Sequence, residues 1–465
     1  MNRTRRRVLG GVLASVATPA LVGTGRAGTS QLPILGTWSA FIASDDPPTR
    51  LKLVVEGRDR GRLIVIDQGE IPISRLEASA AGLRFRIEQP PISYDGRFQG
   101  PDQIRGSCRR GNADIPLNFV RGDFYTEPPE IVFPVEPLSA ARLHELRLMG
   151  GAPAMGVGWQ FMDATAHVLV DGRRAVDHDS EVTPSDQWHL GSVTKSMTAT
   201  LVARLVEAGR LDWHATIAGL LDAQWSDALP AYRDVTVLHL LSHRGGLPRD
   251  VAGSFAAGDL HAARLAYARD ALRQPPSAPL GAQMNYSNAD YVVVGAILES
   301  LTGKTWEALM VEEVFAPLDL ASGGFGPPGA PGRLDQPMGH SPAAIGLRAT
   351  EADIPAVVAP AGRVHMDLAD LLKFLEAHRD RRTPYLREAS WKTLHTPPFG
   401  GDYALGWSVS PTGVLTHGGT NSHWKSEVLV DREAGLAAAS VANVLNNNTQ
   451  SALRQLLAAT KVSRN

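Results

Sequence analysis

The spacing of hydrophobic residues divides the chain into a strand-rich first part and a mixed second part. Between residues 32 and 124, short apolar runs recur between turns rich in Gly, Asp, Asn and Pro. Runs of four or five residues bounded in this way are typical of β-strands. The clearest examples are residues 51–55, 63–66, 83–87 and 117–120. The pattern predicts a small all-β domain, a meander or a barrel, over residues 32–124.

From residue 138 onward, helical and strand-like spacings alternate. A helix is expected over 138–149 and a pair of strands over 154–169, ahead of a helix-rich middle region. Toward the end, the pattern predicts strands over 407–414, 424–430 and 436–444, followed by a helix over 449–461. Helices that pack on an antiparallel sheet, with a helical insert, form an α+β domain. We therefore expect an α+β domain over residues 138–461.

Residues 125–137 separate the two predicted domains. This segment contains four prolines, Pro128, Pro129, Pro134 and Pro137. Because proline fixes its own backbone angle and cannot donate a backbone hydrogen bond, such a segment favours a stiff, extended linker. We place the domain boundary there.

The first 27 residues have the features of a twin-arginine export signal. Arg5, Arg6 and Arg7 precede an apolar run rich in small residues that continues to Val22, and Ala27 is a suitable last residue before cleavage. A short membrane anchor is the alternative, but the run is well below the roughly 20 residues that a spanning helix needs. The sequence therefore predicts a periplasmic or secreted protein, exported by the twin-arginine route, whose mature chain has no integral membrane span.

Charge and cysteine content agree with this expectation. The chain has 43% hydrophobic and 20% charged residues, as ordinary soluble proteins do, and a formal net charge of −2. Without the first 27 residues, which carry five arginines and no acid, that charge is −7. Such mild acidity argues against a nucleic-acid partner. Cys108 is the single cysteine, so no intrachain disulfide forms, which suits a protein that folds in the cytoplasm before export.

A Ser-x-x-Lys pattern occurs twice, and its surroundings distinguish the two copies. After Ser192, apolar residues recur at helical spacing until Gly209, which predicts a buried helix of about four turns with Ser192 in its first turn. Lys195 then lies on the same face as Ser192, within reach for proton transfer. Around Ser422 and Lys425 the residues alternate as in a strand, which directs the two side chains apart. We interpret the second copy as a chance match.

Lysine at position 195 is informative because the chain uses Lys 7 times and Arg 39 times. Arginine stays protonated and cannot act as a base, whereas lysine can. An unperturbed lysine has a pKa near 10.4, so only roughly one in 2,500 is neutral at pH 7. A role as a base therefore requires burial of Lys195 or a hydrogen-bonded network that removes its proton.

Two further short motifs offer groups that complete such a site. Tyr286 and Asn288 precede an apolar helix, and the phenol can relay a proton while the amide holds the lysine or a substrate. His417 begins a His-Gly-Gly-Thr run between two predicted strands. There His417 is suited to bind a substrate carbonyl or carboxylate, Gly419 leaves the backbone open, and the N–H of Thr420 is suited to bind an oxyanion together with that of Ser192. Each motif alone is common in loops and turns.

In this order, the three motifs resemble those of the serine β-lactamase and penicillin-binding-protein superfamily, and most of all its class C β-lactamase-like branch. The resemblance covers residues 138–461. It implies an antiparallel sheet flanked by helices, with a helical subdomain. It also implies that Ser192 is the nucleophile, that Lys195 assists its deprotonation and that Tyr286 is the acid/base partner, with Asn288 orienting the substrate and Lys195. Further matching segments are residues 191–195, 235–248, 317–318, 406–407 and Asn443. Whether Lys195 or Tyr286 is the base stays open.

The chain departs from many members of that superfamily at one position. Many β-lactamases and peptidoglycan peptidases have Lys-Thr-Gly where this chain has His417, Gly418 and Gly419. A histidine with a pKa near 6.5 is mostly neutral at pH 7 and offers no permanent cation to a substrate carboxylate. Esterases, D-amino-acid peptidases and amidases of the superfamily often carry this histidine form, which makes hydrolase a safer description than β-lactamase.

The resulting expectation is an exported serine hydrolase that cleaves an amide or ester bond through an acyl-enzyme on Ser192. Its substrate would be a small molecule or peptide, namely an ester, a D-amino-acid peptide of the DD-carboxypeptidase type or a β-lactam. The alternative is a catalytically weak protein that binds cell-wall fragments or penicillin. No metal-binding or phosphate-binding motif occurs, so we expect no metal and no cofactor. Residues 32–124 loosely resemble a lipocalin-like accessory module, although a simple spacer is an equal alternative.

Overall fold

The computed structural model describes residues 34–42, 49–65, 69–88, 91–110, 113–122, 136–221, 227–253, 255, 258–342 and 347–464. The predicted export signal and most of the predicted linker lie outside the described residues. The chain separates into two compact units, which divide between Thr126 and Glu127. The fold class is confirmed, since an all-β unit precedes an α+β unit.

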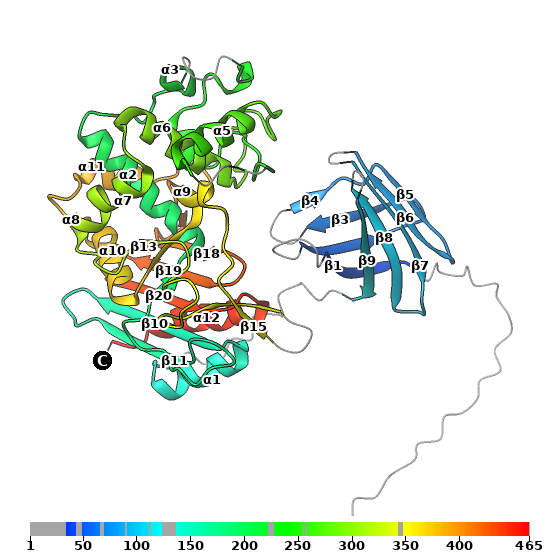
Figure 1. The fold of residues 1–465 in the computed structure, drawn as a ribbon, viewed down its shortest axis with the longest axis horizontal. Coiled ribbons are helices and arrows are strands. Elements are labelled where there is room, and N and C mark those ends of the chain that lie inside the picture. Colours follow the sequence, from blue (N-terminus) through cyan, green and yellow to red (C-terminus); the bar gives the residue numbers. More distant parts are fainter. Residues whose placement is uncertain are drawn as a thin grey trace, which may run out of the picture. The chain divides into compact units, whose positions relative to one another are not determined.

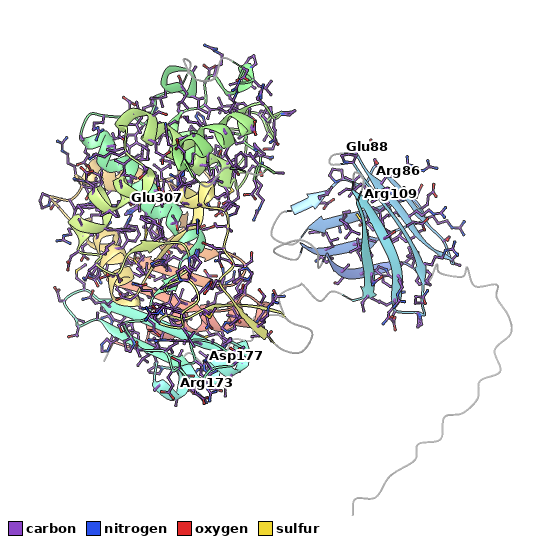
Figure 2. The ribbon with its side chains drawn as sticks, in the orientation of Figure 1. Arg86, Glu88, Arg109, Arg173, Asp177 and Glu307 are labelled. Atoms are coloured by element: carbon purple, nitrogen blue, oxygen red, sulfur yellow. The ribbon has the colours of Figure 1, made fainter. Side chains whose placement is uncertain are left out.

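The first unit is one antiparallel sheet in which the strands follow the order β4-β3-β2-β1-β9-β8-β7-β6-β5 (Figure 1). Buried aromatic side chains, including Trp38, Tyr94 and Phe119, fill one face of this sheet. The other face carries charged side chains such as Arg86 and Arg109 (Figure 2). The strands are β1 (Gly36–Ile42), β2 (Thr49–Val55), β3 (Gly61–Val65), β4 (Gly69–Ile71), β5 (Arg75–Ala78), β6 (Gly82–Ile87), β7 (Ile92–Phe98), β8 (Gln103–Arg110) and β9 (Ala113–Arg121).

The second unit is built on a six-stranded antiparallel sheet with the order β11-β10-β20-β19-β18-β17. All seven residues of the central strand β20 are buried, because helices cover both faces of the sheet. α1 and α12 pack on one face and α10 packs on the other. The elements are β10 (Ala154–Phe161), β11 (His167–Gly172), β17 (Ser408–Val409), β18 (Leu415–Thr420), β19 (Lys425–Asp431), β20 (Leu436–Ala442), α1 (Ala140–Gly150), α10 (Leu368–Asp380) and α12 (Asn447–Thr460).

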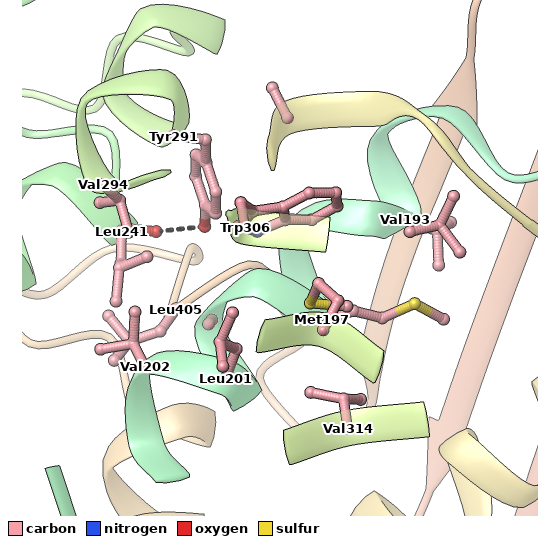
Figure 3. Packing of buried hydrophobic residues seen from close by; sticks show 14 of the residues in the cluster. Val193, Met197, Leu201, Val202, Leu241, Tyr291, Val294, Trp306, Val314 and Leu405 are labelled. Atoms are coloured by element: carbon pink, nitrogen blue, oxygen red, sulfur yellow. Dashed lines mark hydrogen bonds between the residues drawn. The ribbon is translucent and has the colours of Figure 1, made fainter. Parts of the chain in front are cut away.

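A helix-rich region lies beyond the face that α10 covers (Figure 1). Its central element is α2, whose Met197 and Leu201 pack among Trp306, Val314 and Leu405 (Figure 3). Its helices include α2 (Thr194–Glu207), α3 (Ile217–Leu221), α4 (Val237–Leu241), α5 (Leu260–Leu272), α6 (Asn288–Thr302), α7 (Trp306–Met310), α9 (Ala359–Gly362) and α11 (Glu388–His395). The short strands β12 (Trp188–His189), β13 (Gly324–Phe325) and β16 (Val364–Met366) form a separate three-stranded sheet.

One predicted strand differs from the structure. Residues 407–414 do not form a continuous strand, because β17 contains only Ser408 and Val409 and a turn closed by Gly413 follows. Pro411 and Gly413 favour that turn, and together they outweigh the apolar residues around them. The other predicted strands and helices of the second unit are present, with ends shifted by at most three residues.

Candidate active site

Ser192 lies on a tight turn between β12 and α2. The turn is a single 3-10 turn, Gly191–Val193, which continues directly into α2. Gly191 has a φ of 51°, and a Cβ at this position would overlap the backbone nitrogen of Thr420. Glycine therefore lets the serine turn approach the end of β18 closely, and it leaves Ser192 half-buried at the N-terminus of α2.

The amine of Lys195 is fully buried and has three partners. Its Nζ lies 3.2 Å from Ser192 Oγ, 2.7 Å from Asn288 Oδ1 and 2.8 Å from the carbonyl oxygen of Ala361. The amide and carbonyl oxygens can only accept, so the amine donates to both. A neutral amine has two N–H groups and one lone pair, which leaves the lone pair for the Ser192 hydroxyl. Burial also lowers the pKa of Lys195 to about 7.

Asn288 holds Lys195 in this geometry from the first turn of α6. Its Nδ2 donates to Asp250 Oδ1 at 2.9 Å, which directs Oδ1 toward the lysine. The Ser287 side chain caps the same helix by accepting from the Asp290 N–H. Sequence reasoning missed Asp250, because a single acid in a loop carries no motif of its own.

Tyr286 lies next to the lysine. Its ring centroid is 4.7 Å from Lys195 Nζ, and the His243 ring packs against it at 4.4 Å. Burial raises the pKa of Tyr286 to about 12, even though a hydrogen bond with Ser192 acts in the opposite direction. The phenol is therefore protonated at neutral pH and is available as a proton donor.

His417 is buried in β18, and both of its ring nitrogens have partners. Nδ1 lies 2.8 Å from the carbonyl oxygen of Gly418, so Nδ1 carries the proton. Nε2 therefore accepts from the hydroxyl of Tyr403 at 3.0 Å. Burial lowers the pKa of His417 to about 3, and the nearby charge of Lys195 acts in the same direction. The imidazole is neutral at physiological pH, and its predicted contact with substrate stays a prediction.

Gly419 and Thr420 bring β18 against the segment that precedes the nucleophile. A Cβ at Gly419 would overlap the carbonyl oxygen of Leu190, which also accepts from Ser426 Oγ at 2.7 Å. This contact, together with that of Gly191 on Thr420, places two short backbone segments side by side. The structure thus brings the Ser192 turn and Thr420 together, as an oxyanion site requires.

The second Ser-x-x-Lys pair follows β18, where Lys425 lies opposite Thr420, and two further histidines have contacts within the fold. Lys425 in β19 pairs with Glu427 at 2.9 Å, and Ser422 adopts a φ of 83° in the preceding turn. His239 caps α4, and His340 bonds the carbonyl oxygen of Asn443 at 2.8 Å. These contacts give the three side chains roles in folding.

Two properties of the described residues bear on cofactors and membranes. None of the described helices is both long and apolar enough to cross a lipid bilayer. Within the same parts of the chain, no group of three or more His, Cys, Asp or Glu side chains is arranged to hold a metal ion.

Comparison with known proteins gives one family. The sequence model of the Beta-lactamase family matches residues 156–461. Penicillin-binding protein 4 of Amycolatopsis lactamdurans is 31% identical over 235 residues, which are 47% of this chain and 58% of that protein. The chain therefore spans less than two thirds of that relative.

Solved structures show the same fold at lower identity. The octameric penicillin-binding protein homologue from Pyrococcus abyssi superposes with a TM-score of 0.59 at 21% identity, over 70% of this chain and 78% of that one. The D-amino acid amidase from Ochrobactrum anthropi SV3, complexed with L-phenylalanine amide, superposes with a TM-score of 0.57 at 21% identity. The match covers 70% of this chain and 99% of that one.

Proposed function

Because the chain belongs to the Beta-lactamase family of serine hydrolases, we propose that it hydrolyses an amide or ester bond through an acyl-enzyme on Ser192. The observation that carries this proposal is the set of three contacts around Lys195 Nζ. Two obligate acceptors take both N–H groups of a neutral amine, and its lone pair is left for the serine hydroxyl. Such a pair is an activated nucleophile.

In the proposed acylation step, Ser192 Oγ attacks the substrate carbonyl carbon while Lys195 accepts the hydroxyl proton. The carbonyl oxygen becomes an oxyanion, which the N–H groups of Ser192 and Thr420 stabilise. The tetrahedral intermediate then expels the amine or alcohol. Tyr286 protonates this leaving group and regains a proton from Lys195. Both groups thereby return to their starting protonation states.

Deacylation uses the same groups with water in place of serine. Lys195 accepts a proton from water, directly or through Tyr286, and the resulting hydroxide attacks the ester carbonyl. Collapse of the second tetrahedral intermediate breaks the bond to Ser192 Oγ, which receives the proton. The raised pKa of Tyr286 and the lowered pKa of Lys195 favour lysine as the base in both steps.

The state of His417 supports a substrate without a carboxylate at that position. A neutral, internally bonded imidazole provides no permanent cation. Esters and D-amino-acid amides are therefore preferred in this proposal over peptides that end in a carboxylate. The similarity in fold to a D-amino acid amidase agrees with this choice.

Intact-mass measurement of the acyl-enzyme tests the proposal. The protein is mixed with p-nitrophenyl esters, D-phenylalanine amide, D-Ala-D-Ala peptides and penicillin, and product release is followed in parallel. We expect an adduct and turnover that disappear in Ser192→Ala and persist in Ser422→Ala, the matched variant in the second Ser-x-x-Lys pattern. A folded wild-type sample with neither adduct nor turnover would refute the proposal.

A second candidate function follows from the relative in Amycolatopsis lactamdurans. A penicillin-binding role would give a long-lived penicillin adduct on Ser192 with little turnover of esters and amides. The same mass measurement separates the two functions by the lifetime of the adduct.

Export by the twin-arginine route also belongs to the proposal. It is supported by Arg5, Arg6 and Arg7 ahead of a short apolar run. Replacement of Arg5 and Arg6 by lysine should retain the protein in the cytoplasm, whereas replacement of Arg3 should not. Equal export of both variants would contradict this route.

A further inference from the structure

One buried carboxylate connects the two backbone segments of the proposed oxyanion site. Asp353 lies in the loop before the Ala356–Val358 turn, and its side chain is 5% exposed. Neither the serine turn nor β18 contains it. Side chains from both segments nevertheless reach it.

On the serine side, the link is His189 in β12. The Gly191 N–H donates to His189 Nδ1 at 3.1 Å, so Nδ1 carries no proton and the proton of the neutral ring is on Nε2. Nε2 lies 3.2 Å from Asp353 Oδ1, which is within ion-pair distance but lacks the alignment of a hydrogen bond. His189 therefore connects the carboxylate to the residue directly before the nucleophile.

On the β18 side, the link is Asn421, which follows Thr420. Asn421 Nδ2 donates to Asp353 Oδ1 at 2.8 Å, and Asn421 Oδ1 accepts from the His423 N–H at 3.1 Å. The second bond fixes the orientation of the amide. Because Asn421 is buried, water does not compete for the hydrogen bonds that fix this orientation.

Arg363 completes the surroundings of the carboxylate by donating from Nε to Oδ2 at 2.7 Å. Burial raises the pKa of Asp353, but the contacts with His189, Arg363 and Asn421 outweigh it and lower the pKa to about 2. Asp353 is therefore ionised, and hydrogen bonds from Arg363 and Asn421, together with the His189 ring beside Oδ1, hold it in place.

We propose that Asp353 is a positioning residue, which sets the distance between the N–H groups of Ser192 and Thr420 through His189 and Asn421. This inference rests on the proposed acyl-enzyme function. Oxyanion donors act at about 2.7–3.1 Å from the oxygen, and a displacement of about 1 Å costs large factors in rate. A carboxylate bound to both segments resists such a displacement.

Asp353→Asn tests this role, with Asp370→Asn as the matched control. Asp370 is also buried, but it forms an ion pair with Lys373 and accepts a hydrogen bond from Ser322 Oγ. For Asp353→Asn we expect kcat to fall about 10- to 100-fold with KM little changed. Affinity for a boronic-acid inhibitor, whose adduct mimics the oxyanion, should fall by a similar factor. Asp370→Asn should leave both values within twofold of wild type.

Hydrogen exchange of backbone amides provides a readout that does not depend on turnover. In Asp353→Asn, hydrogen exchange should accelerate in the peptides that contain Ser192 and Thr420. In Asp370→Asn, exchange in both peptides should match that of the wild type. Unchanged exchange in both peptides, or unchanged kcat in an active enzyme, would overturn the role of Asp353. A wild-type protein without activity would instead refute the proposed acyl-enzyme function. The exchange measurement alone would then test whether Asp353 holds the Ser192 and Thr420 segments in place.

A separate observation concerns the charged face of the first unit. The exposed positions of β5 to β8 carry six arginines and include two cross-strand pairs, Arg75 opposite Arg86 and Arg97 opposite Arg105. Like charges directly opposite one another destabilise a sheet. The six are Arg75, Arg84, Arg86, Arg97, Arg105 and Arg109.

Acidic side chains offset part of this charge. Glu77 pairs with Arg75 at 2.7 Å and Asp95 pairs with Arg84 at 2.9 Å. Within the described parts of the chain, Arg86 has no acidic partner, and neither do Arg97 and Arg105.

A groove of about 430 Å³ crosses this face. Its lining includes Arg86 and Arg109, which Figure 2 labels, together with Ser93 and Ser107. The acids Glu77 and Asp95 also line it, each paired with an arginine. Guanidinium groups bind phosphate through two parallel hydrogen bonds, and serine hydroxyls can donate a further one. The groove therefore offers positive charge and directional donors to the same ligand.

From this arrangement we infer that the face binds inorganic polyphosphate, a polymer with repeated phosphate groups. Long-chain polyphosphate is the probe, and its binding to the full chain is measured by fluorescence anisotropy at several salt concentrations. Arg86→Ser combined with Arg97→Ser should weaken binding at least about tenfold. Arg60→Ser combined with Arg62→Ser, the control in the β2–β3 hairpin of the same unit, should change it less than about twofold.

The salt dependence and a second polymer sharpen this test. Binding should weaken as salt increases, because screening shortens the range of the charges. Equal losses in the two double variants would overturn the assignment of the face. Equal or tighter binding of poly-glutamate would overturn the preference for phosphate, and no binding of polyphosphate would refute the inference altogether.

Discussion

The Asn288 amide donates to the Asp250 carboxylate at 2.9 Å, and this bond turns the amide oxygen toward the lysine of the site. Because an amide can present either oxygen or nitrogen, its orientation decides whether Lys195 meets an acceptor or a competing donor. A loop carboxylate that contacts neither the nucleophile nor the lysine thus influences the proton on the proposed base.

The substitution Asn288→Asp should shift the pH dependence of the reaction. It places a carboxylate about where Oδ1 now lies, 2.7 Å from Lys195 Nζ. A nearby negative charge favours the charged amine, which raises the pKa of Lys195 and moves the acidic limb of kcat/KM upward by about one unit or more. Asn285→Asp, which alters an amide that bonds Ser277 instead, should leave the limb in place.

The wild-type pH profile provides a second prediction. The base must be neutral to accept the serine proton, and burial lowers the pKa of Lys195 to about 7. Activity should therefore be low in acid, rise as pH increases through about 7 and then level off. Since the pKa of Tyr286 is about 12, its ionisation should cause no loss until strongly alkaline pH. A profile of kcat/KM without an acidic limb near neutrality would contradict lysine as the base.

Lys195→Arg should be nearly inactive despite keeping the positive charge. A guanidinium stays protonated and cannot accept the serine proton, so kcat should fall about 10²- to 10⁴-fold. Lys304→Arg, which retains a cation beside Glu312 on the surface, should keep kcat within about twofold. Steady-state kinetics with a p-nitrophenyl ester would measure both. Comparable losses in the two variants would show that arginine disturbs folding rather than catalysis.

Gly419→Ala should separate β18 from the serine turn. The new methyl group would overlap the carbonyl oxygen of Leu190, so one of the two segments must move. We expect kcat to fall about 100-fold through the oxyanion site, together with a lower melting temperature. Gly258→Ala is the control, since open space surrounds that position. Full activity of Gly419→Ala would mean that the Thr420 N–H is not needed.

The sequence was sufficient for the parts of the site that depend on local spacing. Helical periodicity after Ser192 predicted its place at the start of a buried helix and the shared face with Lys195, and the structure has both. The same reasoning was wrong for the strand predicted over residues 407–414, where Pro411 and Gly413 form a turn instead. Local propensity works where neighbours along the chain decide the conformation.

The supporting contacts were beyond the reach of such reasoning. Asp353 meets His189 and Asn421 across 164 and 68 residues, and Asp250 meets Asn288 across 38. No periodicity encodes these pairs, because they arise only when separate loops are packed together. The hydrogen bond between Tyr403 and His417 has the same origin, since no motif predicts that the two side chains meet.

The position of β20 in the middle of the sheet affects how the protein becomes active during its synthesis. This strand pairs with β10 on one side and with β19 on the other. β10, the first strand of the second unit, therefore cannot join the rest of the sheet until residues 436–442 have been synthesised. Pairing across such a long stretch of chain is slow, since loop closure must come first. The ribosome therefore releases Ser192 and Lys195 long before their oxyanion partner in β18 is held in place. An unfinished chain therefore carries Ser192 and Lys195 without the β18 segment that the proposed hydrolysis requires.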